Sequence, residues 1–342
     1  MEQKRIKTEG PQTQNSAFGN PQRSGFVVVV VLCMVMLLGV LLLGFNYKSR
    51  TNLCAVDDFR KSEQALNCAR AGLNITAAII RDTNDIHTNK TLLNLLSGEK
   101  TFAVGDGECS MTITEENGRL NVNQLKDKGG RLDRTRTEQL LRLIDLLNRE
   151  RAGHSHMGYG LVPSIIDWTD NDDQVTCLPF IKHENLGAES SYYNELRPPY
   201  KCKNGPLDTT EELLLVKGVA QEVFDHIRSH VTVYGDGEIN INCASKYVIE
   251  SLSEKMDAAL AQMIIDRRKF KPFDSIAELR DVPGMMDAIY YTIKKIATVR
   301  SKDQYYHVES RGTVDDLECI VVAILKRNME TQNIDVVLYK EL

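Results

Sequence analysis

The most constraining feature of this sequence is a run of 20 residues, Phe26 to Phe45, without a charged or strongly polar side chain. A helix of that length, rising about 1.5 Å per residue, is about 30 Å long and matches the hydrocarbon core of a bilayer. A buried helix of a soluble protein is the alternative, but such a helix normally carries a polar stripe. We therefore predict one transmembrane helix over residues 26–45.

The flanks of this apolar run predict its orientation. Residues 1–25 are polar and carry four basic residues against two acidic ones. Positive residues before a first apolar helix keep the N-terminus in the cytoplasm, so the rest of the chain is expected across the membrane. An ordinary secretory signal would have a small-residue cleavage site after the run. Here the candidate cleavage position lies before the run, between Gly25 and Phe26.

Beyond the membrane, residues 53–82 have apolar side chains in steps of three, four and seven, which predicts an amphipathic helix. Strand patterns occur near both ends of this part, at 101–104, 109–114, 305–314, 317–326 and 334–339. Helical patterns fill the middle. If the strands share one sheet, the fold is α+β, with a long pilin-like N-terminal helix packed on an antiparallel sheet and a large inserted α-helical domain. Separate domains are the alternative.

The predicted organisation has five segments. These are a leader (1–25), the transmembrane helix (26–45, continuing to about 82), the first part of the α+β domain (83–123), the inserted helical domain (124–300) and the C-terminal strands (301–342). The middle of the chain contains a repeat, since Gly118–Asn123 returns as Gly237–Asn242. Each copy is expected to form a short strand whose final Asn caps the next helix by accepting a backbone N–H bond.

Two segments, 216–220 and 282–286, resemble the hairpins of helix-hairpin-helix or sterile-alpha-motif-like units. The DNA-binding form has two glycines that let backbone N–H groups approach a phosphate. Each hairpin here lacks the second glycine, and acidic residues dilute the basic ones nearby. The hairpins therefore favour packing or protein contact over nucleic-acid binding.

The junction at Gly25 and Phe26 resembles a prepilin leader, in which a prepilin peptidase cuts after the glycine and the new N-terminal Phe is methylated. Pilins usually have Glu as the fifth mature residue, where this chain has Val30. Further motifs follow: a D-W-x-D-x-D run from Asp167, a G-A-E element ending at Glu189, a Tyr-Tyr pair and a Pro-Pro-Tyr turn. With the Val30 departure and both repeat copies, they are similar to the K-type minor pseudopilins of type II secretion systems (general secretion pathway protein K).

This resemblance implies a structural protein, and no motif such as H-E-x-x-H or G-x-S-x-G suggests an enzyme. It implies one helix in a bacterial inner membrane, a cytoplasmic N-terminus and a periplasmic globular domain. It further implies that the chain caps the pseudopilus tip, contacts the I- and J-type minor pseudopilins and the major pseudopilin, helps to start assembly and limits length during protein export. The alternative is a membrane-anchored helix-hairpin-helix receptor for DNA uptake.

Residues 167–173 contain four aspartates, which repel one another unless they are solvated or bound to a cation. Oxygen ligands on irregular backbone suit Ca²⁺, although the spacing is not that of an EF-hand. The family resemblance implies a Ca²⁺ site completed by distant segments, with Asp170, Asp172, Glu189 and Asn204 as ligands. Asp167, at a predicted helix end, is interpreted as structural. A solvated acidic loop without metal is the alternative.

The chain has eight cysteines. Cys33 lies in the apolar run, which leaves seven beyond it, so these cannot all pair within the chain. Cys177 and Cys202 flank the proposed Ca²⁺ loop, and an oxidising periplasm would permit a disulfide between them.

Overall fold

The computed structural model describes residues 21–82, 100–127, 129–150 and 156–342, so most of the predicted leader lies outside the described residues. The chain divides into two compact units, Met1–Lys61 and Ser62–Leu342. Helix α1 (Pro21–Asp82) runs through the boundary between them. Gly25 and Phe26 lie in the first turns of this helix.

The described part of the first unit is the N-terminal part of α1. No side chain between residues 25 and 61 is buried, and Phe26 and Leu43 are 71% and 73% exposed. Among the described residues, one helix, over Gly25–Asp82, is long and apolar enough to cross a membrane. Apolar surface is unfavourable in water. This surface therefore suits a single membrane anchor, covered by lipid or by other helices.

The second unit contains a five-stranded antiparallel sheet with the strand order β1-β2-β7-β8-β9. Its strands are β1 (Lys100–Val104), β2 (Gly107–Glu115), β7 (Asp303–Val314), β8 (Leu317–Asn328) and β9 (Ile334–Glu341). Buried and partly buried residues alternate along β7, as expected for a strand with one face on a core. The strand patterns at both ends of the globular part thus share one sheet, and the predicted α+β class is confirmed.

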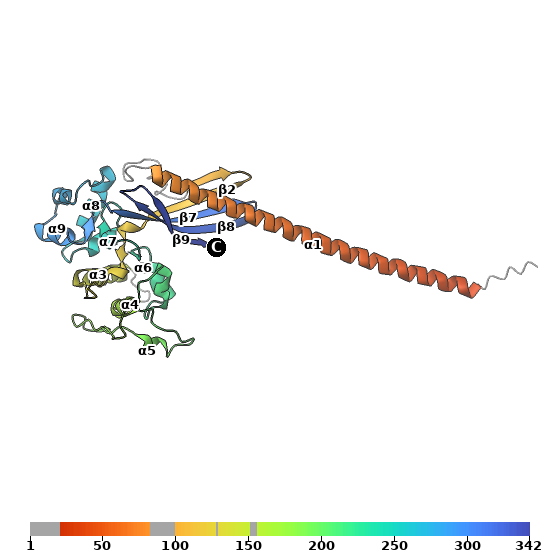
Figure 1. Cartoon of the computed structure of the whole chain (residues 1–342), viewed down its shortest axis with the longest axis horizontal. Coiled ribbons are helices and arrows are strands. Elements are labelled where there is room, and N and C mark those ends of the chain that lie inside the picture. The colour runs from red at the N-terminus through yellow and green to blue at the C-terminus, as the bar shows by residue number, and fades with distance from the viewer. Residues whose placement is uncertain (1–20, 83–99, 128, 151–155) are drawn as a thin grey trace, which may run out of the picture. The chain divides into compact units, whose positions relative to one another are not determined.

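The C-terminal part of α1 lies against one face of this sheet (Figure 1). Ala69 and Leu73 of the helix share a core with Met111 and other sheet residues. Small residues allow a close approach, because a Cβ atom built at Gly72 would lie 2.2 Å from Ser310 Oγ. The small-residue run that begins at Ala69 therefore marks the docking point of the helix.

The helical part of the second unit leaves the sheet and returns to it at the same end, because Glu115 at the end of β2 pairs with Tyr306 near the start of β7. It contains the helices α3 (Arg134–Glu150), α4 (Leu161–Thr169), α5 (Ser190–Tyr193), α6 (Gln221–Ile227), α7 (Lys246–Ser251), α8 (Ala258–Phe270) and α9 (Asp287–Ile293). Short 3₁₀ turns separate them: η1 (Glu116–Gly118), η2 (Val122–Gln124), η3 (Thr210–Leu215) and η4 (Ile276–Asp281). One hydrophobic core, from Leu120 to Val299, holds this part together.

The two repeat copies form the same structure. β3 (Leu120–Asn121) pairs in parallel with β4 (Val231–Thr232), and β5 (Ile239–Asn240) pairs in parallel with β6 (Ala297–Thr298). In each copy the first Asn accepts a hydrogen bond from the N–H two residues later, at 2.9 and 3.0 Å. The prediction that the final Asn is the cap was wrong. The first Asn, whose backbone is extended at Asn121, lies where its side chain reaches that N–H.

The final Asn of each copy ties two distant segments to the motif. Asn123 donates to the carbonyls of Leu207 and Val233 and accepts from the N–H of Leu207, over 2.8 to 3.1 Å. Asn242 makes the same three bonds with Phe273 and Val299, over 2.9 to 3.1 Å. Each set is termed an asparagine clasp below, in the first repeat (118–236) and the second repeat (237–299).

A helical hairpin precedes the closing strand of each repeat. Gly218 lies between η3 and α6 with φ 87°, and Gly284 lies between η4 and α9 with φ 85°. Such positive φ values favour glycine. The basic residues beside the second hairpin have partners: Arg267 lies 3.4 Å from Glu278, Lys269 3.7 Å from Asp266 and Lys271 3.1 Å from Asp274. This neutralised surface favours packing over phosphate binding.

Candidate metal site

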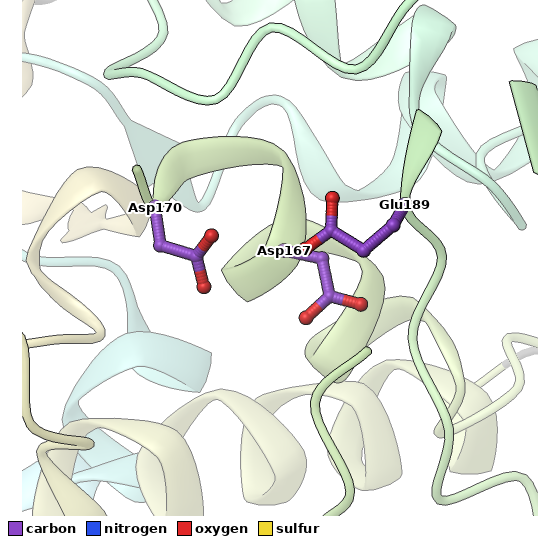
Figure 2. A group of neighbouring side chains, drawn as sticks. All are labelled: Asp167, Asp170 and Glu189. Carbon is purple, nitrogen blue, oxygen red and sulfur yellow. The ribbon is translucent and has the colours of Figure 1, made fainter. Parts of the chain in front are cut away.

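Three buried carboxylates meet at the end of helix α4. Asp167 lies in its last turn, Asp170 follows as its C-cap residue, and Glu189 is the N-cap residue of α5. Each offers one carboxylate oxygen, and these three atoms lie within 4.8 Å of one another. Figure 2 shows Asp167 on α4, Asp170 at the end of this helix, and Glu189 entering from the neighbouring segment.

The local sequence explains why these groups converge. Residues 161–168 are all buried, which places the end of α4 inside the domain. Asp167 and Asp170 are three residues apart and so share one side of the helix end. Gly187 lets the segment carrying Glu189 pass close to α4, since a Cβ atom there would lie 2.1 Å from Asp167 Oδ2 and 2.6 Å from the Pro163 carbonyl oxygen. Any side chain at position 187 would push that segment away.

These carboxylates have more oxygens than partners. Asp167 Oδ1 accepts from the Thr176 N–H at 2.8 Å, and the Lys126 ammonium pairs with Asp170 Oδ2. Asp167 Oδ2, Asp170 Oδ1 and both carboxylate oxygens of Glu189 are buried without a hydrogen-bond partner. Because unpaired buried polar groups cost free energy, this arrangement is unfavourable unless a cation or protons bind to it.

The electrostatics point in the same direction. Burial, and then repulsion from Asp167 and Asp170, raises the pKa of Glu189 to about 8. Burial also raises the pKa of Asp167 and of Asp170, although the Lys126 ammonium opposes the shift at Asp170. A divalent cation among these oxygens would favour their charged forms and reverse all three shifts.

The other two predicted ligands lie beside this group. Asp172 Oδ1 accepts from the Gln174 N–H at 2.9 Å within its own loop, and the Asp172 main-chain carbonyl accepts from Asn204 Nδ2 at 2.7 Å. Asn204 Oδ1 is buried without a partner. The structure thus brings Asp170 and Glu189 together with Asp167, whereas the side chain of Asp172 is not in the group. The three-residue spacing between Asp167 and Asp170 was the sequence signal that Asp167 belongs to this group of carboxylates.

The aromatic residues of the same motif have a packing role. Trp168 lies edge-on to Tyr193 and Tyr200, with ring centroids 5.0 and 6.2 Å apart, and Tyr193 stacks on Tyr200 at 5.3 Å. The Tyr193 hydroxyl accepts from the Lys217 N–H at 3.1 Å, and the Tyr200 hydroxyl donates to the Leu215 carbonyl at 2.8 Å. The aromatic cluster therefore fixes α4 and α5 to the first hairpin.

The predicted Cys177–Cys202 disulfide is not formed in this structure, in which both cysteines are free. Cys202 is buried, with its Sγ 3.5 Å from the Asp167 carbonyl oxygen, and burial raises the pKa of its thiol to about 12. Cys177 is exposed and forms an isolated β-bridge with Leu186. The two thiols thus lie in different surroundings.

The two repeats coincide with two matches to known sequence families. Residues 118–236 and 239–298 match successive family descriptions, both of which read Type II secretion system (T2SS), protein K. Type II secretion system protein K of Aeromonas hydrophila is 20% identical over 329 residues, which cover 91% of this chain and 95% of that protein. The protein of the same name from Klebsiella pneumoniae is 25% identical over 280 residues, which cover 78% and 81%.

A solved structure shares the fold. The crystal structure of the GspK–GspI–GspJ complex from the type 2 secretion system of enterotoxigenic Escherichia coli contains a chain that aligns with a TM-score of 0.63 and 20% identity. The alignment covers 86% of this chain and 99% of that one. The long helix, the sheet and the helical insertion are therefore a known arrangement.

Proposed function

We propose a place at the periplasmic tip of the pseudopilus for this chain, which belongs to the type II secretion system protein K family and is a minor pseudopilin. The family is a structural component of a secretion machine and is not a known enzyme family. At the tip the chain would help to start assembly and limit the length of the pseudopilus during protein export. Its apolar helix α1 suits an inner-membrane anchor, with the N-terminus cytoplasmic and the second unit periplasmic.

The observation that carries the tip position is the absence of an acid in the apolar part of α1. Cleavage after Gly25 by a prepilin peptidase would make Phe26 the methylated first residue and Val30 the fifth. In a subunit with another one ahead of it, an acid at the fifth position can pair with the terminal amine of that neighbour. A tip subunit has no such neighbour, so an acid there would be buried unpaired in apolar surroundings, at a cost of several kcal/mol.

The same exposed helix defines the expected partners. Between residues 25 and 61 no side chain of α1 is buried by the rest of the chain. Helices of the I- and J-type minor pseudopilins, and of the major pseudopilin below them, would cover this surface outside the lipid. The fold shared with a chain of the GspK–GspI–GspJ complex supports this assignment.

The carboxylate group is proposed to hold a structural Ca²⁺ ion. Asp167, Asp170 and Glu189 would supply carboxylate oxygens, and Asn204 its unpartnered amide oxygen. Oxygen donors on irregular backbone suit this hard cation, and the ion would supply the positive charge that compensates the buried carboxylates. The side chain of Asp172 is left out of this set because it bonds to its own loop. Without the ion, the raised pKa values indicate that protons would take its place.

Complementation of secretion tests the tip proposal. In a host that lacks its own protein K, the wild-type chain should restore secretion, and the I- and J-type minor pseudopilins should copurify with it from membranes. Val30→Glu should abolish secretion, whereas Val30→Leu, which keeps the position apolar, should not. Gly25→Val should leave the leader uncut. Full secretion with Val30→Glu, or no copurifying pseudopilin, would contradict the proposal.

A further inference from the structure

Cysteines gather where α1 meets the sheet. Gly312 of β7 lies directly under the helix, since a Cβ atom built on it would lie 1.9 Å from the Ala65 carbonyl oxygen. Cys68 of α1 and Cys109 of β2, both free thiols in this structure, are buried there in one small core with Ala65 and Val314. Cys319 of β8 packs against this core. Three of the seven cysteines beyond the apolar run thus lie at one contact.

The neighbouring contacts place Cys109 next to the position of Cys68, whose Sγ lies 3.5 Å from the Val104 carbonyl oxygen. A Cβ atom built at Gly107 would lie 2.9 Å from Cys68 Sγ, and one built at Gly72 would lie 3.2 Å from the side chain of Met111. Cys68 and Gly72 are one helical turn apart on α1. Gly107, Cys109 and Met111 are alternate residues of β2 and so share one face. Cys109 is the residue of that face between the two contacts.

Cys319 lies on the other flank of the helix. Gly312 pairs with Cys109 on one side and with Cys319 on the other, so two strand spacings, about 9–10 Å, separate the two cysteines. That separation exceeds the reach of a disulfide, which requires Cα atoms within about 7 Å. Cys319 Sγ instead lies 3.5 Å from the carbonyl oxygen of Ser62, away from the flank that Cys68 occupies.

We propose that Cys68 and Cys109 form a disulfide that fastens α1 to the first hairpin of the sheet. The proposal rests on the periplasmic placement of the second unit in the proposed function, because an oxidising compartment supplies the reaction partner. A thiolate of one cysteine attacks the disulfide of a dithiol–disulfide oxidant, and the second cysteine then displaces that mixed disulfide. The two thiols lose two protons and two electrons, one S–S bond forms, and the oxidant is reduced to its dithiol.

The burial of both thiols indicates when the disulfide forms. Both sulfur atoms are buried once α1 has docked, and burial raises the pKa of both thiols, so they are poor nucleophiles in the folded chain. Exchange therefore takes place during folding, before the helix covers β2. Besides the polypeptide chain itself, the disulfide would be a second covalent link between α1 and the sheet. It would keep α1 attached when a force pulls on the helix.

The test is thiol trapping in the full-length chain. Cells that export it are quenched with acid, the protein is denatured and alkylated without reductant, and peptides are mapped by mass spectrometry. A peptide pair linked through Cys68 and Cys109 is expected, lacking two hydrogen atoms and absent after reduction. Cys319→Ser should leave this link intact, whereas Cys68→Ser should leave Cys109 alkylated. Alkylation of both cysteines in the wild type, or a link from either one to Cys319, would overturn the pairing in cells.

A refolding experiment tests the Cys68–Cys109 pairing independently of the periplasmic location of the second unit. The purified full-length chain is reduced, unfolded and refolded in detergent with oxidised and reduced glutathione. A Cys68–Cys109 link formed here but missing in cells supports the pairing and contradicts the periplasmic placement. A link missing in both experiments overturns the pairing, whatever the location of the second unit.

Discussion

The two repeats of the helical insertion have the same paired strands and asparagine clasps. They differ in the segment that connects the two clasped residues. Asn123 and Leu207, joined by the first clasp, are 84 residues apart, whereas Asn242 and Phe273, joined by the second, are 31 apart. The longer connection of the first repeat carries α3, α4, α5 and the three buried carboxylates. The shorter connection of the second repeat carries α7 and α8.

The buried polar side chains of the second repeat all have partners. Ser275 and Glu278 form a reciprocal capping box at η4, and Arg267 pairs with Glu278 and lies 5.4 Å above the ring of Phe273. Residues 239–298 are all described, and none of them has a buried side-chain nitrogen or oxygen without a partner. In the first repeat, Asp167, Trp168, Asp170, Glu189 and Asn204 all have such atoms.

This difference shows what a longer connection requires. The longer connection of the first repeat packs Trp168, Tyr193 and Tyr200 into one cluster. It also brings together carboxylates, and several of their oxygens accept no hydrogen bond. A bound cation would supply partners for the carboxylates of the first repeat, as the capping box and the Arg267 contacts supply partners for polar side chains of the second. The comparison predicts that the two repeats share a dependence on their clasps and differ in their dependence on Ca²⁺ and pH.

The largest expected effect is loss of a clasp. Asn242→Ala would leave the Phe273 N–H and two carbonyl groups unpaired, at about 1–3 kcal/mol for each unsatisfied buried group. Asn123→Ala should destabilise the chain by a similar amount because it removes the same three bonds. Urea unfolding of the full-length chain in detergent measures both changes in the free energy of unfolding.

Calcium affinity distinguishes the two clasp variants. Asn123→Ala also releases Leu207, which bounds the segment that carries the carboxylates, so it should weaken Ca²⁺ binding in calorimetric titration. Asn242→Ala should leave the affinity unchanged because its bonds lie in the other repeat. Equal affinity in both variants would mean that the first clasp does not support the metal site.

Sequence periodicity was sufficient to predict most of the fold. Runs of β-branched and aromatic residues between turn residues placed the strands of the sheet, and the repeat of Gly118–Asn123 marked two equivalent units. The assignment of the cap within each motif was wrong, because Asn121 and Asn123 are both plausible caps and the choice depends on local backbone angles and on contacts more than 80 residues away. Such distant contacts leave no local pattern.

The candidate site was predicted in part for a similar reason. Asp170 and Glu189 were expected to meet, and they do. Asp167 was interpreted as a structural residue at a helix end, although its spacing from Asp170 puts both on one side of α4. Asp172 was chosen for its charge, but its carboxylate bonds to the Gln174 N–H two residues later. Local hydrogen bonding of this kind competes with metal binding, and composition does not reveal it.

The second prediction concerns metal removal. If Ca²⁺ binds the folded state alone, a concentration one hundred times its Kd should stabilise the chain by ~2.7 kcal/mol. Chelation should therefore lower the melting temperature, and hydrogen exchange should rise in the first repeat, around α4 and α5, more than in the second. Asp170→Ala should abolish this Ca²⁺ effect, since it removes a charge and a ligand.

Two variants serve as matched controls for that prediction. Asp172→Asn keeps a side-chain acceptor for the Gln174 N–H, so the Ca²⁺ effect should remain. Ser275→Ala removes the capping box of the second repeat and should cost about 1 kcal/mol, equally with Ca²⁺ and with chelator. Identical melting temperatures of the wild type with and without Ca²⁺ would leave the first repeat without a metal.

The smallest expected effect, when taken per pH unit, is the pH dependence of the metal-free chain. The pKa of Glu189 is about 8 in the folded chain and close to its ordinary value of 4.5 in the unfolded chain. Between these values the folded state holds more protons than the unfolded state, so the free energy of unfolding should fall as pH rises. For one proton the slope is at most about 1.4 kcal/mol per pH unit, and it levels off above the folded pKa.

Saturating Ca²⁺ should remove this slope, because the ion holds Glu189 in its charged form throughout the same range. Glu189→Gln should remove most of it without any metal, since the amide has the shape of the carboxyl group but no proton to gain. Unfolding free energies from urea titrations between about pH 5 and pH 8, with chelator and with Ca²⁺, measure the difference. A metal-free wild type with the same pH dependence as metal-free Glu189→Gln would show that Glu189 is ionised in the folded chain. The buried carboxylates would then already be compensated, and the first repeat would resemble the second.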